Sequence, residues 1–186
     1  MTKCTPDLHN SARLYSLSTY LWGATKDEKY RTAAIQSARW MESLNINANN
    51  IVLDTVHAND CSRSPANWIF TYNSGKYVEG LSVLTDITGD THWRNLMVKI
   101  IAAAVKSAPW QAIFIRGLAE VYTRSSSTGN LRPLLRSYID VQFNALLDLA
   151  ANGSTYSSTW RGPPQAFTTW GQLAALDVFA SAIVAN

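Results

Sequence analysis

Apolar residues recur along the chain at the three- and four-residue spacing of amphipathic helices. From position 93 onward this series places one side chain after another on a single helix face: Trp93, Leu96, Met97, Ile100, Ile101 and Ala104. The same spacing predicts helices near residues 7–23, 26–44, 72–88, 91–107, 112–124, 131–151 and 166–184. No stretch alternates convincingly between apolar and polar residues, so the sequence predicts an all-α fold with little or no sheet.

Capping residues agree with these helices. Thr25 and Glu28 fit a capping box at the start of the second helix. Gly89 followed by Asp90 predicts the end of one helix and the N-cap of the next. Helices joined this closely are expected to form antiparallel hairpins.

The predicted hairpins resemble each other weakly. Residues 21–30 and 84–93 share Leu, Thr, Asp and an aromatic residue at matching places. Such self-similarity is typical of stacked helical hairpins, in solenoids or in α/α toroids. Two long irregular segments, 45–70 and 153–167, interrupt the pattern, and long loops in a compact domain are often functional.

Composition excludes several classes of protein. Hydrophobic residues make up 47% of the 186 residues and charged residues 16%, which is unlike a disordered chain. We expect one domain spanning residues 1–186. No apolar run is long enough to span a membrane. The net charge is +3 and the basic residues are scattered singly, so no nucleic-acid partner is expected.

The cysteines and histidines show no metal-ligand spacing, and we expect neither a metal nor a cofactor. Cys4 and Cys61 form a disulfide in a secreted protein or remain two free thiols. One glycosylation sequon, Asn152-Gly153-Ser154, favours secretion, although this chain has no apolar signal region at its start.

Few side chains are candidates for catalysis. Asp54 and Asp60 lie on one loop and are the weak candidate pair for glycoside hydrolysis, which needs two carboxyl groups across the sugar. The alternative is that both are polar loop residues. Arg116 lies in an apolar segment, where its charge needs a partner or a wet cavity; Glu120, four residues on, could pair with it.

Aromatic side chains beside the loops are candidates for stacking on a sugar ring. Trp68 and Trp160 have such positions, as does Trp110. The alternative for each is a place in the core, where most aromatic residues of a helical-hairpin protein pack.

Three segments resemble glycoside hydrolase family 76, particularly its fungal members. They are Trp68–Gly75 with the following Glu79-Gly80-Leu81 and Thr88-Gly89-Asp90, Ile113–Tyr122, and Trp160–Pro164 with Gln172–Asp177. The resemblance covers nearly the whole chain, from about Leu14 to Val184. It implies an (α/α) toroid, a link to α-1,6-mannan-type polysaccharide or oligosaccharide, and a secreted or cell-wall location. The family cleaves with retention, using a nucleophile and an acid/base carboxylate.

The resemblance also implies roles for single residues. Tyr72, Asn73, Gly75 and Arg116 match family positions that shape or line the groove, and Asp54 matches a loop aspartate that precedes the Tyr-Asn motif. Alternatively, Asn73 and Gly75 cap and start a helix, and Tyr72 belongs to the core.

The chain departs from the family in its carboxylates. The family's catalytic pair is two adjacent aspartates, on a segment upstream of the matched region, and this sequence contains no Asp-Asp. We therefore expect an incomplete (α/α)6-like toroid that is weak or inactive as a hydrolase. The alternatives are a lectin-like protein and a bioactive interaction protein without catalysis. A toroid cut in this way exposes apolar helix faces, which predicts a homodimer.

Overall fold

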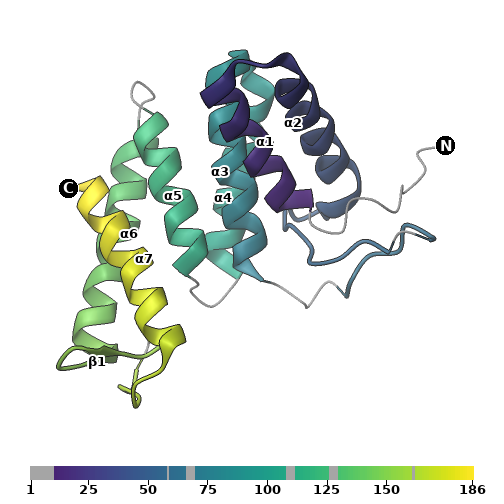
Figure 1. Cartoon of the computed structure of the whole chain (residues 1–186). Coiled ribbons are helices and arrows are strands. Elements are labelled where there is room, and N and C mark those ends of the chain that lie inside the picture. Colours follow the sequence, from purple (N-terminus) through teal and green to yellow (C-terminus); the bar gives the residue numbers. More distant parts are fainter. Residues whose placement is uncertain (1–10, 58, 66–69, 108–111, 126–129, 161) are drawn as a thin grey trace. The chain divides into compact units, whose positions relative to one another are not determined.

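The computed structural model describes residues 11–57, 59–65, 70–107, 112–125, 130–160 and 162–186. Most of this part of the chain is helical, as predicted, and the longest non-helical stretches lie between η1 and α3 and between α6 and α7 (Figure 1). Its elements are α1 (Ser11–Thr25), α2 (Glu28–Trp40), the π-helical turn η1 (Met41–Asn45), α3 (Thr71–Thr88), α4 (Thr91–Ser107), α5 (Ala112–Arg124), α6 (Leu131–Ala150), β1 (Ala151–Asn152), β2 (Thr155–Tyr156) and α7 (Thr169–Ala185).

The junction of α3 and α4 has the predicted caps. Gly89 adopts a left-handed conformation, with φ of 65°, and its N–H donates to the carbonyl of Thr85 at 2.8 Å. The carboxylate of Asp90 accepts the backbone N–H of His92 at 2.8 Å. One helix therefore ends and the next begins within two residues.

The predicted capping box before α2 is wrong. Asp27 is the N-cap, and its carboxylate accepts the backbone N–H of Lys29 at 3.0 Å. The hydroxyl of Thr25 instead donates to the carbonyl of Leu21 at 2.7 Å, inside the last turn of α1. Thr25 thus ends the preceding helix, because Asp27 lies closer to the first free N–H groups of α2.

The described helices form two compact units, residues 1–108 and 109–186. In the first unit α1 packs against α2 and α3, and α3 packs against α4. Its fully buried side chains include Tyr15, Met41, Tyr77, Leu81, Leu84 and Ile100. A Cβ at Gly80 would collide with the ring of Tyr15, so the close approach of α1 to α3 depends on this glycine.

In the second unit α7 packs against α5 and α6. Its fully buried side chains include Phe114, Ile115, Leu118, Ile139, Leu146 and Trp160. The short antiparallel hairpin β1–β2 follows α6 directly and is the one sheet in the described part of the chain. The backbone of β2 reaches α7 at Gly171, where a Cβ would collide with the carbonyl of Tyr156.

Across the described residues, every helix is too short or too polar to cross a bilayer. The prediction of a single domain spanning residues 1–186 stays a prediction.

Candidate functional site

A buried asparagine anchors the loop that leads to the candidate site. The side-chain amide of Asn45 donates to the carbonyl of Leu53 at 2.9 Å, and the N–H of Leu53 donates to the carbonyl of Asn45 at 2.8 Å. Both residues are buried. Ile46 and Val52 form a bridge next to this pair, on the side nearer the turn. Asp54 follows Leu53 directly in the chain. Its position is therefore fixed by the two buried hydrogen bonds of the residue before it.

The carboxylate of Asp54 is the centre of a polar cluster. The hydroxyl of Tyr72 donates to its Oδ1 at 2.5 Å, and the amide of Asn73 donates to the same oxygen at 2.9 Å. The hydroxyl of Thr55 donates to Oδ2 at 3.2 Å. Tyr72 and Asn73 come from the first turn of α3, so the site joins the loop to the start of that helix. The four side chains are half-buried.

These contacts decide the charge of Asp54. Burial by itself would raise the pKa of its carboxyl group, but the hydrogen bonds from Tyr72, Asn73 and Thr55 outweigh it and lower the pKa below the ordinary value. Asp54 is therefore a carboxylate at neutral pH. It can accept hydrogen bonds from sugar hydroxyls, but a low pKa does not suit a general acid.

Asp60 has a different environment from that of Asp54. It is exposed, and its carboxylate accepts the backbone N–H of Ser62 at 2.9 Å. This bond and the nearby His57 lower its pKa. Asp60 therefore closes a turn of the loop, and its hydrogen-bond partners differ from those of Asp54.

The residues of the Tyr-Asn motif are placed as follows. Tyr72 and Asn73 both bind Asp54, and the ring of Phe70 stacks on that of Tyr72 with centroids 5.6 Å apart. Asn73 does not cap α3, because the N-cap is Phe70 and the Asn73 side chain is turned to the carboxylate. Gly75 is buried inside α3. Thr55 was not predicted as a site residue, and its place next to Asp54 is the only signal the sequence holds.

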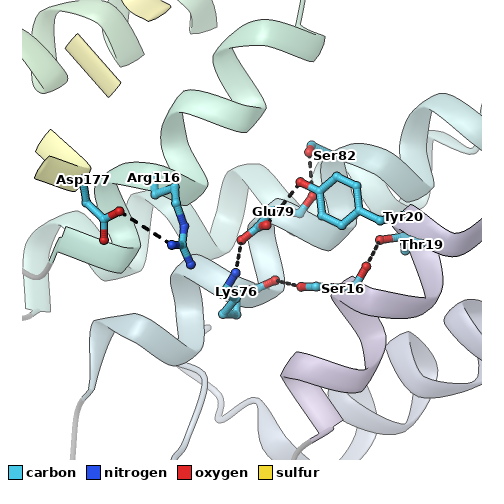
Figure 2. Close-up of polar contacts among 8 residues, drawn as sticks. All are labelled: Ser16, Thr19, Tyr20, Lys76, Glu79, Ser82, Arg116 and Asp177. Carbon is cyan, nitrogen blue, oxygen red and sulfur yellow. Dashed lines mark hydrogen bonds and ion pairs between the residues drawn. The ribbon is translucent and has the colours of Figure 1, made fainter. Parts of the chain in front are cut away.

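The remaining predicted residues lie elsewhere. Arg116, on α5, pairs with Asp177 of α7 at 3.6 Å (Figure 2). Glu120 pairs with Arg124 instead. The predicted Arg116–Glu120 pair is therefore not the one observed. Trp160 is 1% exposed, so its ring has no open face for a sugar. Trp68 and Trp110 lie outside the described residues.

A second polar cluster, around Glu79, was not predicted from the sequence. Glu79 is 7% exposed and lies on α3. Its carboxylate accepts one hydrogen bond from the ammonium group of Lys76 at 2.8 Å and one from the hydroxyl of Tyr20 at 3.2 Å (Figure 2). The hydroxyl of Ser16 donates to the carbonyl of Lys76 at 2.9 Å. The cluster joins α1 to α3 and gives a buried charge its partners.

The loop that carries Asp54 also carries a disulfide. Cys61 is disulfide-bonded, and the other cysteine of the sequence, Cys4, lies outside the described residues. Among the described residues no group of three His, Cys, Asp or Glu side chains could hold a metal ion.

Solved structures are similar to this chain over most of its length. The α-1,6-mannanase GH76A from Salegentibacter sp. HEL1_6 matches 91% of it with a TM-score of 0.82 and 16% identity. The Lin0763 protein from Listeria innocua matches 93% with a TM-score of 0.79 and 18% identity. Bt3792 from Bacteroides thetaiotaomicron, a family 76 mannosidase, matches 94% with a TM-score of 0.78 and 16% identity.

This chain spans about half the length of each of these structures, which it covers to 56%, 54% and 53% respectively. Inactive variants of the Salegentibacter enzyme, each with two consecutive aspartates replaced, are in complex with α-1,6-mannotetrose and α-1,6-mannotriose. No curated protein matches the chain.

The paired helices and the matching structures place this chain in the (α/α) toroid fold class, as predicted. The model of glycosyl hydrolase family 76 matches residues 9–131, about two thirds of the sequence. The chain belongs to glycosyl hydrolase family 76.

Proposed function

We propose that this protein binds α-1,6-mannan-type glycans and hydrolyses them weakly or not at all. The observation that carries the proposal is the Asp54 carboxylate, held ionised by Tyr72 and Asn73 at the junction of loop and helix. Such a group accepts hydrogen bonds from sugar hydroxyls. The residue is half-buried rather than fully enclosed.

Two further observations support this function. The chain belongs to family 76, and similar structures hold α-1,6-linked manno-oligosaccharides. The printed sequence has no adjacent aspartates, whereas replacing two consecutive aspartates accompanies inactivity in the Salegentibacter enzyme. A protein that binds the glycan but hydrolyses it weakly or not at all is consistent with these two observations.

The test is incubation with α-1,6-mannan, followed by analysis of released oligosaccharides and by retention on the same insoluble material. We expect retention of the chain with little or no release. Asp54→Asn should weaken retention by about tenfold, which is the loss of roughly one charge-assisted hydrogen bond. Asp60→Asn is the matched control and should bind as the original chain does, because Asp60 only closes a loop turn.

Efficient release of oligosaccharides would contradict the proposal. If Asp54→Asn and Asp60→Asn both abolished such release, these residues would be the catalytic pair instead. Circular dichroism of each variant separates loss of binding from loss of the fold.

An interaction protein without a sugar ligand is the second candidate. It is favoured by apolar side chains along one side of α7 that are each more than half exposed: Trp170, Leu173, Leu176, Ile183 and Val184. Absence of retention on mannan, with no change in tryptophan fluorescence on adding α-1,6-mannobiose, would support this candidate.

Location and assembly form part of the same proposal. A disulfide at Cys61 is typical of an oxidising compartment and supports a secreted or cell-wall protein. The fungal type is proposed from the motif resemblance alone. The exposed face of α7 supports a homodimer, in which a second copy covers it.

A further inference from the structure

The hairpin after α6 presents an acceptor sequence for N-linked glycans at its tip. Asn152 ends β1, Gly153 and Ser154 form the two-residue loop, and β2 begins at Thr155. Gly153 has a φ of 59°, a conformation that suits glycine in such short loops. The sequon therefore coincides with a tight turn.

All three sequon residues are exposed. Apart from Gly153 and its two chain neighbours, no described atom lies within 4 Å of the place where a Cβ on Gly153 would lie, which leaves open space around the tip. In the described part of the chain the side-chain amide of Asn152 has no hydrogen bond. A bulky sugar on its Nδ2 would displace no hydrogen bond among the described residues.

The hairpin itself is firmly attached. Ser157 is fully buried, and its N–H donates to the carbonyl of Ala150 at 3.0 Å. The side chain of Gln172, in the first turn of α7, donates to the carbonyl of Ser154 at 3.1 Å. An exposed acceptor on an anchored turn can carry a glycan without unfolding its surroundings.

The disulfide at Cys61 is an independent observation. Disulfides persist in oxidising compartments, and the eukaryotic secretory pathway is the compartment in which Asn-x-Ser sequons are modified.

We propose that Asn152 is an N-glycosylation site that receives a lipid-pyrophosphate-linked oligosaccharide from a host transferase. The Nδ2 of Asn152 loses one proton and forms a bond to the anomeric carbon of the first sugar. The bond from that carbon to the pyrophosphate oxygen breaks, and the lipid pyrophosphate leaves with its electron pair. This modification does not depend on mannan binding.

The test is expression of the full chain behind a cleavable secretion leader in a eukaryotic host. Secreted and retained material are both analysed, after cleavage of the leader confirms entry into the secretory pathway. We expect a heavier species that peptide:N-glycosidase converts to the unmodified mass, leaving aspartate at position 152 in peptide mass spectra.

Matched variants assign the site. Asn152→Gln and Ser154→Ala should each lose the heavier species completely, whereas Ser154→Thr should retain it. Asn144→Gln, at an exposed asparagine of α6 outside any sequon, should leave it unchanged. Translocated chain without a glycan at position 152 would overturn the proposal.

A second measurement tests whether the folded state accepts the glycan. The thermal unfolding midpoint of the glycosylated chain should equal or exceed that of Asn152→Gln, because the tip is exposed and its amide has no partner. A lower midpoint would show that the glycan displaces native contacts and would contradict the structural argument.

Discussion

The charge of Asp54 depends on a small number of donors. Burial opposes ionisation, and three hydrogen bonds more than offset it, of which the shortest comes from Tyr72. A hydrogen bond of 2.5 Å from a hydroxyl to a carboxylate is at the short, strong end of such bonds. Tyr72 is therefore the residue whose removal should change Asp54 most.

Tyr72→Phe should raise the pKa of Asp54, because the loss of one donor leaves burial less opposed. A lowered pKa in the folded state stabilises the fold above the ordinary pKa of about 3.9, and this contribution is lost as the pH falls through the folded value. The variant should therefore unfold more easily at neutral pH, by about 1 kcal/mol, with a smaller difference in acid.

Carboxyl titration by NMR and urea unfolding at neutral and acidic pH measure these two effects. Tyr156→Phe is the matched control, because the described part of the chain has no hydrogen bond to the Tyr156 hydroxyl. An unchanged Asp54 pKa in Tyr72→Phe would show that the bond to Tyr72 does not determine the charge.

At the scale of elements, α1 and α3 approach each other through a glycine and an aromatic ring. The Tyr15 ring lies against Gly80 and contacts the ring of Tyr77, with centroids 5.3 Å apart. Both tyrosines are fully buried. The helices therefore cannot accept a larger side chain at position 80 without moving apart or displacing the ring.

Gly80→Ala should destabilise the protein by about 1–3 kcal/mol, since the added methyl group overlaps a fully buried ring that must move to make room for it. Gly23→Ala is the matched control in α1. It has open space around it, and should be neutral or stabilise by up to about 1 kcal/mol through helix propensity. The denaturation midpoints of both variants measure the difference.

A double-mutant cycle identifies the cause. Gly80→Ala should cost less in a Tyr15→Ala background, because the ring that it overlaps is absent. Equal costs in the two backgrounds would mean that Tyr15 is not the obstacle.

The helices could be predicted because each has its own local signal. Apolar spacing located all of them, and Gly89 with Asp90 marked one junction to the residue. The N-cap of α2 was harder to predict, because Thr25 and Asp27 are both favourable cap residues. Only the backbone conformation between α1 and α2 determines which of them accepts the free N–H of the second helix.

The candidate site was partly predictable for a related reason. Tyr72, Asn73 and Asp54 were named from motif resemblance, whereas their hydrogen bonds depend on the loop held by Asn45. The hydrogen bond between Tyr20 and Glu79 joins helices that are distant in sequence. Arg116 pairs with Asp177, more than sixty residues away, and not with Glu120. Tertiary pairings of this kind leave no periodic signal in one sequence.

At the scale of the whole molecule, α7 has two apolar sides. One is buried, with Gly171, Ala175, Val178, Ser181, Ala182 and Ala185 inside the second unit. The other side carries Leu173, Leu176 and Ile183, which are all more than half exposed. Soluble monomers rarely leave a continuous apolar stripe in water, so an uncovered face of this kind favours association.

Because the same stripe is present on every copy, the simplest cover is a second molecule that packs its α7 symmetrically against the first. We expect a dimer in sedimentation velocity at micromolar concentration. Leu176→Lys should shift it to monomer, since each dimer would bury two charges without partners. Leu134→Lys, at an equally exposed leucine of α6, should leave the dimer intact. A monomeric original chain would mean that α7 is covered by something other than a second copy, and a dimer that survives Leu176→Lys would place the contact on another face.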